Sequence, residues 1–158
     1  MNASTASCSC RLERSVPGVS EDFAVTATWL RGFQARVQTR GHEIAVDEPE
    51  ADGGTDAGVM PTDLLAASIA SCFCLALAFC AGKRGRELPG LQVVVRRQRA
   101  GRELRYERFD IDARAKVPEE ELAALMEPAR RVCWVSNTLA HGLELSYGYT
   151  SVDARTQR

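Results

Sequence analysis

The sequence lacks the features that would assign it to several common classes of protein. Its 158 residues carry 20 basic and 21 acidic side chains, a formal net charge of -1. General nucleic-acid and anionic-membrane binders usually carry an excess of positive charge, so we expect neither kind of partner. The N-terminal residues lack the apolar run of a signal peptide, and we therefore expect no export. The length and composition favour a globular domain able to bury its own core.

Histidine is scarce, with two residues, and the six cysteines are not spaced as a disulfide framework. Cys8 and Cys10 lie in a polar segment, Cys133 stands alone, and the other three share one apolar run. Such thiols are typical of the reducing cytoplasm, where they are structural, redox-active or metal-bound. A zinc site needs about four ligands at short spacing, and Cys72 and Cys74 point to different sides of a helix. We therefore expect no metal.

Alternating hydrophobicity predicts that the first third of the domain is β-structure. A glycine-containing connection at residues 30–32 predicts a hairpin between the first two strands. Seven acids and no Lys or Arg lie between Glu43 and Asp63, and the part of this segment that ends near Gly58 is typical of a long flexible loop. The basic residues of 83–108 either form a solvated strand face or attract this acidic loop, in the same chain or in a partner chain. The three strands are expected at residues 23–29, 33–37 and 42–46.

The longest uncharged run, residues 64–81, predicts a central helix that starts near Pro61 and ends at Gly82. Proline suits the first turn of a helix, and the charge of Asp63 complements its positive end. The run reaches the lower length limit of a membrane span, but its Ala, Ser and Cys content and the lack of a second span favour a buried helix. A helix that is apolar on all sides has to be covered on all sides. Since the rest of the chain offers few elements for this, we expect a homodimer.

The second half of the chain predicts two more strands, a second helix and a final strand. The strands lie around 91–95 and 104–113, and a change of phase predicts a β-bulge near Glu107 and Arg108. Pro118 starts the second helix, Pro128 bends or breaks it, and a further helical piece follows. The element order βββ-α-ββ-α-β defines an α+β fold. The expected organisation is an N-terminal tail at 1–20, one domain at 21–150 with its last strand at 143–149, and a C-terminal tail at 151–158.

Two cysteines are candidates for chemistry. Cys72 is either an inert small hydrophobic residue of the helix or a reactive thiolate. The second role needs a nearby cation to lower its pKa from about 8.5. Cys133 is the natural partner, but it is 61 positions away. Only the fold can bring the two Cα atoms within the roughly 4.4–6.8 Å that a disulfide requires. We expect Cys74 and Cys80 to be packing residues.

The segments PTDLLAASIASCFCLAL and RRVCWVSNTL resemble two motifs of the OsmC/Ohr family of peroxide-handling proteins. That family has a Pro-Glu-Glu-Leu-Leu-type helix start that leads into Ala-Ala-Cys, and later a Cys-Pro-Val-Ser segment, where Trp134 replaces the proline. The segment VTATWLRGF is similar to the family's first hairpin, so the resemblance covers roughly residues 22–150. It implies an OsmC-like fold, an intertwined homodimer whose central buried helix carries the cysteine.

The resemblance also implies a chemistry. Cys72 would be the peroxidatic thiolate, and its sulfenic acid would condense with Cys133 to a disulfide. An external dithiol would reduce this disulfide, and no bound cofactor is expected. By motif position Arg31 favours the thiolate. The Glu that holds this Arg in relatives is replaced by Thr62, followed by Asp63, a shorter acid whose reach to Arg31 the sequence leaves open.

Three functions are compatible with these residues. The first is a cytoplasmic peroxidase, for which the apolar neighbours of Cys72 favour organic hydroperoxides over hydrogen peroxide. The second is a non-catalytic small-molecule binding protein of the same fold, favoured by the loss of Glu at Thr62. The third is a thiol redox sensor, which would be oxidised stoichiometrically with negligible turnover.

Overall fold

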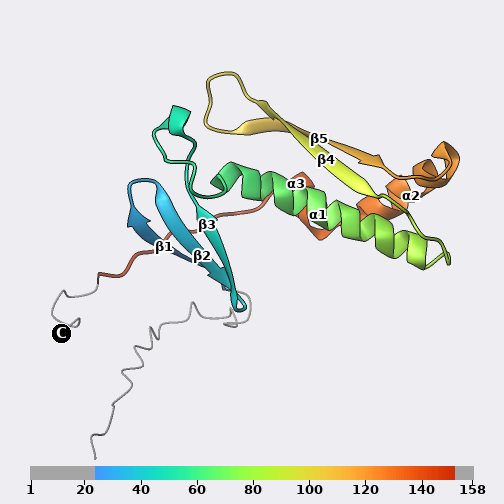
Figure 1. Ribbon diagram of the computed structural model, residues 1–158, viewed down its shortest axis with the longest axis horizontal. Coiled ribbons are helices and arrows are strands. Elements are labelled where there is room, and N and C mark those ends of the chain that lie inside the picture. Colours follow the sequence, from blue (N-terminus) through green and yellow to red (C-terminus); the bar gives the residue numbers. More distant parts are fainter. Residues whose placement is uncertain (1–23, 152–158) are drawn as a thin grey trace, which may run out of the picture. The chain divides into compact units, whose positions relative to one another are not determined.

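The computed structural model describes residues 24–151, and these form two compact units that divide after Pro61 (Figure 1). The expected tail at 1–20 lies outside the described residues, and so do residues 152–158 and Cys8 and Cys10. In chain order the elements are β1 (Thr26–Arg31), β2 (Gln34–Thr39), β3 (His42–Val46), η2 (Glu50–Asp52), α1 (Pro61–Gly82), β4 (Gln92–Arg99), β5 (Tyr106–Arg114), α2 (Glu119–Val132) and α3 (Trp134–His141).

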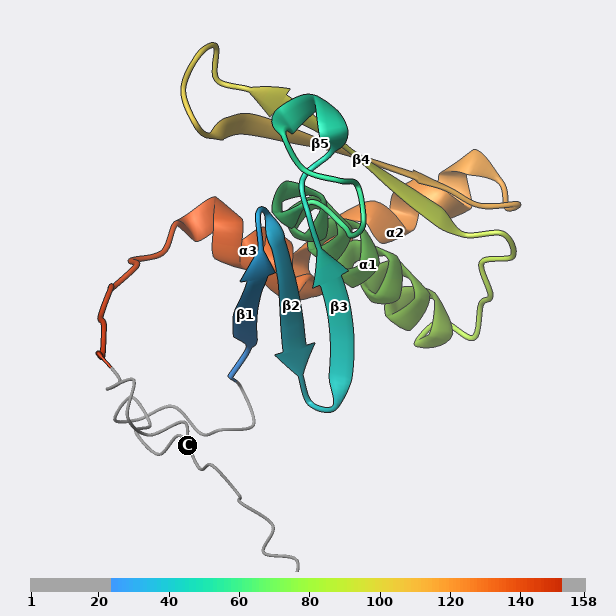
Figure 2. The same cartoon turned by 60° about the vertical axis from the view of Figure 1, so that its left-hand side comes forward.

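The first unit is built on a three-stranded antiparallel sheet in the order β1-β2-β3, visible from its face in Figure 2. Its first hairpin turns at Gly32, whose φ of 50° lies in the left-handed region that glycine adopts at little cost. The indole Nε1 of Trp29 donates a hydrogen bond to the Gly32 carbonyl at 3.0 Å and braces the turn. The turn places Arg31 directly opposite Gln34 in the strand register. The predicted hairpin and third strand are therefore confirmed.

The acidic segment after β3 is organised around one carboxylate. The side chain of Asp47 is buried and accepts hydrogen bonds from the backbone N–H groups of Glu48, Thr55 and Ala57 at 2.9, 3.0 and 3.1 Å. The segment then returns to the sheet, where a Cβ on Gly58 would lie 2.6 Å from the Ala45 carbonyl carbon. Only glycine permits so close an approach of two backbones. A segment whose sequence is typical of a flexible loop is thus held by specific hydrogen bonds.

The second unit packs helices against a two-stranded sheet. β4 and β5 pair antiparallel, and Figure 1 shows this hairpin alongside α1. Gln98 pairs with Arg108 and Arg99 with Tyr106, so Glu107 is an extra residue and the predicted bulge is confirmed. α2 continues through Pro128, and the break between α2 and α3 falls at Cys133.

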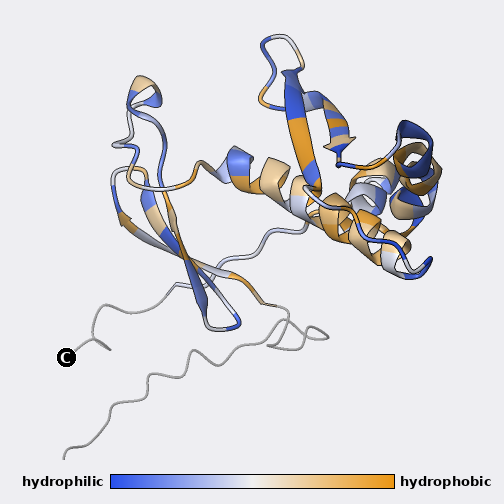
Figure 3. Cartoon of the chain, turned by 45° about the vertical axis from the view of Figure 1, so that its right-hand side comes forward, coloured by the Kyte–Doolittle hydropathy of each residue, from blue (hydrophilic) through white to orange (hydrophobic). Residues whose placement is uncertain are grey.

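The core of the second unit is centred on α1, which is hydrophobic along most of its length (Figure 3). By length and composition, α1 is the one helix among residues 24–151 that could cross a membrane. One side of α1 contacts α2 and the inner residues of the β4–β5 hairpin. The buried cluster consists of Phe73, Ala76, Leu77, Cys80, Ala81, Leu125, Ala129 and Cys133.

The alternating segment 143–149 forms no strand in the described part of the chain, contrary to our prediction. Leu143, Leu145, Tyr147 and Tyr149 are all exposed, with Tyr147 at 90% and Tyr149 at 100%. A strand requires a neighbouring strand for its backbone hydrogen bonds. Residues 143–149 have the alternation of a strand, but they pair with no other strand among the described residues.

Candidate thiol redox site

Cys133 lies at the junction of α2 and α3 and is completely buried. Its backbone is extended, with φ -78° and ψ 102°, which ends one helix and allows the next to begin. Its Sγ lies 3.1 Å from the hydroxyl oxygen of Ser136, one turn into α3. Ser136 was not among the predicted site residues, although a Cys-x-x-Ser spacing at a helix start is a recognisable signal for this contact.

Cys72 lies in the middle of α1, partly buried and packed against the cluster that contains Cys133. Both cysteines are free thiols in this structure, as are Cys74 and Cys80. Cys80 belongs to the buried cluster itself, in agreement with the packing role predicted for it. Two of the cysteines singled out from the sequence thus contribute to one apolar core, and the bond between their sulfurs stays a prediction.

Arg31 ends β1 in the first unit, while the two thiols belong to the second. Its guanidinium Nε donates to the side-chain carbonyl of Gln34 at 3.0 Å. The amide nitrogen of Gln34 donates in turn to the hydroxyl of Thr55 at 2.8 Å. Gln34 and Thr55 were not among the predicted site residues, because contacts between a hairpin and a loop 21 residues away leave no local pattern.

Asp63 and Thr62, the residues considered as supports for Arg31, both contact another arginine. Arg97 of β4 forms an ion pair with Asp63, and its Nη1 donates to the Thr62 hydroxyl at 3.3 Å. Its guanidinium also lies over the ring of Tyr106, 5.6 Å from the centroid. Arg97 was not singled out either, because it is one of many arginines in a basic stretch.

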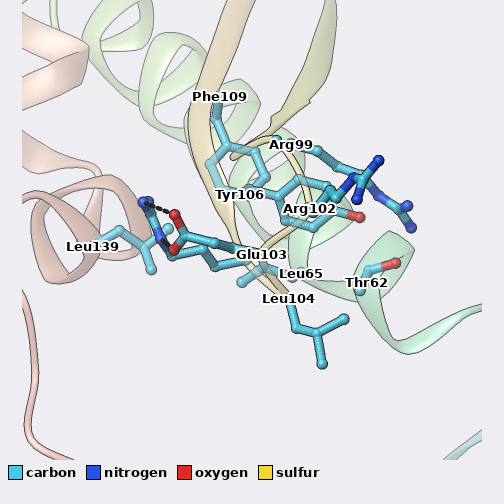
Figure 4. A pocket seen from close by; sticks show the side chains of 11 residues that line it. Thr62, Leu65, Arg99, Arg102, Glu103, Leu104, Tyr106, Phe109 and Leu139 are labelled. Carbon is cyan, nitrogen blue, oxygen red and sulfur yellow. Dashed lines mark hydrogen bonds and ion pairs between the residues drawn. The ribbon is translucent and has the colours of Figure 1, made fainter.

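A pocket of about 580 Å³ lies beside the first turns of α1 (Figure 4). This volume is within the roughly 300–1,000 Å³ typical of small-molecule sites. Its wall combines apolar side chains with arginines near the turn between β4 and β5, where Arg105 forms an ion pair with Glu103 at 2.6 Å. Tyr106 and Phe109 are in contact there, with ring centroids 5.5 Å apart. The lining residues are Thr62, Leu65, Arg99, Gly101, Arg102, Glu103, Leu104, Arg105, Tyr106, Phe109 and Leu139.

A second pocket, of about 440 Å³, is lined by Ser136 and by Phe73, the neighbour of Cys72 in α1. Glu127 and Arg130 lie at its wall and are paired at 2.7 Å. Hydrogen bonds from Arg130 and Arg131 lower the pKa of Glu127 to about 2. Ser136, whose hydroxyl lies beside the buried thiol of Cys133, thus borders this cavity.

Among residues 24–151, no cluster of three or more His, Cys, Asp or Glu side chains could hold a metal ion. Cys72 instead packs against an apolar cluster that contains a second thiol, Cys133, and the Sγ of Cys133 lies beside the Ser136 hydroxyl. This arrangement defines an α+β protein whose helical unit has Cys80 and Cys133 in its apolar core and Cys72 packed against that core.

The comparisons identify the family. The OsmC-like protein family model matches residues 53–148, which is more than half of the chain, and the chain therefore belongs to the OsmC-like family. The family resemblance and the α+β fold class predicted from the sequence are confirmed. No curated protein matches the chain in sequence.

Solved structures agree with the fold at low identity. An OsmC-like protein from Mycoplasma pneumoniae is 16% identical with a TM-score of 0.65, covering 77% of this chain and 89% of that one. A putative osmotic stress induced and detoxification response protein from Psychrobacter arcticus is 21% identical with a TM-score of 0.62, covering 72% and 85%. An organic hydroperoxide resistance protein OsmC from Legionella pneumophila is 23% identical with a TM-score of 0.57, covering 73% and 88%.

Proposed function

We propose that this protein is a cysteine-based hydroperoxide reductase in which Cys72 is the peroxidatic and Cys133 the resolving residue. The observation that carries the proposal is the presence of both free thiols in the apolar core of one unit, one partly accessible and one completely buried. Membership of the OsmC-like family and the hydroperoxide resistance named for structural neighbours support it.

The reaction balances over two thiol groups. The Cys72 thiolate attacks the terminal oxygen of the hydroperoxide, the O–O bond breaks, and the alcohol leaves after taking up a proton. Cys72 is then a sulfenic acid. The Cys133 thiol attacks its sulfur, water leaves, and a disulfide forms. An external dithiol reduces that disulfide by two electrons and restores both thiols.

Arg31 stabilises the Cys72 thiolate in this proposal. A thiol in apolar surroundings resists ionisation, whereas a guanidinium beside it favours the charged form. Arginine suits this role because it stays protonated at every physiological pH. Arg31 is exposed on its hairpin, so its guanidinium is accessible in the single chain.

Organic hydroperoxides are the substrates we propose. Cys72 packs among apolar side chains. An apolar peroxide is stabilised by leaving water for such surroundings, whereas hydrogen peroxide gains little from them. No bound cofactor takes part, and the external dithiol is the reductant.

The working form that we propose is a cytoplasmic homodimer with neither nucleic-acid nor membrane partners. Leu75 and Phe79 of α1 are exposed at 71% and 53%, and β1 is exposed along its whole length. A second copy of the chain covers these surfaces and gives residues 143–149 a strand to pair with.

A binding protein without catalysis is the second candidate, and the contacts of Asp63 favour it. Within the second unit Arg97 engages both Asp63 and Thr62, so the two residues considered as supports for Arg31 already have another arginine as their partner. For a binding protein, Cys72→Ser leaves ligand affinity unchanged. A redox sensor instead shows one oxidation per chain and no turnover with any dithiol.

Steady-state consumption of tert-butyl hydroperoxide with excess dithiol tests the proposal. We expect Cys72→Ser to abolish turnover and Cys74→Ser, two residues away on the same helix, to retain it. Consumption by the wild type no faster than by a free thiol would overturn the peroxidase assignment.

A further inference from the structure

Arg31 is the first member of a continuous hydrogen-bond chain within the first unit. Its Nε–H donates to Gln34 Oε1 at 3.0 Å, and Gln34 Nε2 donates to Thr55 Oγ1 at 2.8 Å. The Thr55 hydroxyl donates to Asp47 Oδ2 at 2.6 Å. These three hydrogen bonds therefore link an exposed guanidinium on a hairpin to a buried carboxylate in the loop after β3.

The carboxylate of Asp47 determines which group donates and which accepts in each of these hydrogen bonds. Ionised Asp47 has no proton to donate, so the Thr55 hydroxyl is the donor between them. The remaining lone pairs of Thr55 then accept from the amide nitrogen of Gln34. This leaves the carbonyl of Gln34 to face Arg31, which is the orientation that a guanidinium needs.

Asp47 is rigidly held and stays charged. Besides Thr55 Oγ1, three backbone N–H groups donate to its two oxygens. The hydrogen bond from Thr55 contributes most to lowering the pKa of Asp47 to about 2, and the backbone donors contribute further. At neutral pH the anchor is thus a fixed anion with no alternative hydrogen-bond direction.

We propose that Gln34, Thr55 and Asp47 are positioning residues that aim Arg31 at the thiolate it stabilises. The inference rests on the proposed function, in which Arg31 assists Cys72. A neutral amide as the direct partner orients the guanidinium without offsetting its charge. A carboxylate in the same place would form an ion pair and reduce the positive potential left for a thiolate.

The first test of this chain does not depend on activity. Proton–nitrogen NMR follows the Arg31 Nε–H group and its exchange with water in the wild type and in variants. We expect Gln34→Met and Thr55→Val to accelerate this exchange at least about tenfold, because each removes a link that restrains the group, and Thr55→Ser to preserve the protection. The matched control is Gln38→Met, which makes the same substitution on the same strand, at a glutamine that contacts Glu43. Equal exchange in all five proteins would overturn the proposal.

The second test measures the rate at which iodoacetamide alkylates Cys72 over a range of pH values, which reports the pKa of its thiol. For a thiol whose pKa lies above neutral pH, each unit of increase in that pKa reduces the thiolate fraction about tenfold. We expect Gln34→Met and Thr55→Val to slow alkylation about three- to tenfold at pH 7, and Thr55→Ser and Gln38→Met to leave it unchanged. Circular dichroism verifies that each variant is folded.

Arg31→Met separates the role of Arg31 from the positioning role of Gln34 and Thr55. If Arg31→Met slows alkylation and the Gln34 and Thr55 variants do not, the positioning role is overturned while the role of Arg31 stands. If Arg31→Met leaves alkylation unchanged, the proposed role of Arg31 fails, and so does the positioning role that depends on it.

Discussion

At the scale of single residues, the two candidate thiols differ in their access to solvent. Cys72 is partly exposed on α1, whereas Cys133 is completely buried beside Ser136. In the proposed mechanism, a hydroperoxide arriving from solution therefore meets Cys72 first. The buried Cys133 is shielded from external oxidants. In the proposed mechanism it reacts only with the sulfenic acid formed at Cys72.

This difference predicts an order of labelling. With a small excess of iodoacetamide on the reduced protein, Cys72 is alkylated at least about tenfold faster than Cys133, because a reactive thiol has to be accessible. Peptide mass spectrometry resolves the two sites and separates both from Cys8 and Cys10. Faster labelling of Cys133 would contradict the assignment of roles.

Asp47 predicts a second residue-scale effect, on stability against pH. Its pKa in the folded protein is lowered from 3.8 to about 2, so the folded state binds this proton less readily than the unfolded state. The stabilisation is fully present above pH 3.8 and is lost as the pH falls through about 2. We expect Asp47→Asn to lower the melting temperature at pH 7, and the gap to the wild type to narrow from about pH 4 towards pH 2.

Thermal melts at a series of pH values measure this gap. Asp56→Asn, at an exposed acid of the same loop, is the control and is expected to show a smaller change at pH 7. A gap between wild type and Asp47→Asn that stays constant down to pH 2 would contradict the structural role of the carboxylate.

At the scale of the elements, α1 contributes most of the core of the second unit. Leu77 is completely buried there, in contact with the cluster that also holds Leu125 and Cys133. Truncating such a side chain removes its transfer free energy and leaves a cavity. We therefore expect Leu77→Ala to lower the free energy of unfolding by about 2–5 kcal/mol.

Urea denaturation at fixed protein concentration measures this loss. Leu104→Ala, at a fully exposed leucine near the turn between β4 and β5, is expected to change stability by no more than about 0.5 kcal/mol. Equal losses in the two variants would show that α1 is not packed as the structure has it.

Most elements were predictable because their signals are local. Pro61 and Gly82 mark the ends of α1, and the change of phase at Glu107 revealed the bulge in β5. The expected strand at 143–149 was wrong because alternation reports which side chains share a face, whereas a strand also needs a partner.

The candidate site was less predictable than the fold. Cys72, Cys133 and Arg31 stood out through the family resemblance. The partners of Arg31 and Asp63 depend instead on which distant residues the fold places beside them. Gln34 and Arg97 occupy those places, and neither belongs to a recognisable motif.

At the scale of the whole molecule, the apolar surface left uncovered by one chain is the main observation. Trp29 in the first unit is exposed at 71%, and Leu75 and Trp134 in the second at 71% and 83%. Large exposed apolar side chains of this kind suit a protein–protein interface. The proposed homodimer covers this surface.

The prediction at this scale is that the protein sediments with twice its chain mass of 17.3 kDa. Leu75→Glu places a charge on the exposed face of α1 and is expected to shift the dimer towards the monomer, with a dissociation constant raised at least about tenfold. Analytical ultracentrifugation over a dilution series measures this. A wild type that is monomeric at every concentration would contradict the proposal.

The most direct test of the central claim is intact-protein and peptide mass spectrometry after one equivalent of an alkyl hydroperoxide is added to the reduced protein. The account predicts a Cys72–Cys133 disulfide in the wild type, a sulfenic acid trapped at Cys72 in Cys133→Ser, and neither product in Cys72→Ser. Reduced thiols in the wild type after the peroxide is added, or a sulfenic acid at Cys133 in place of Cys72, would contradict it.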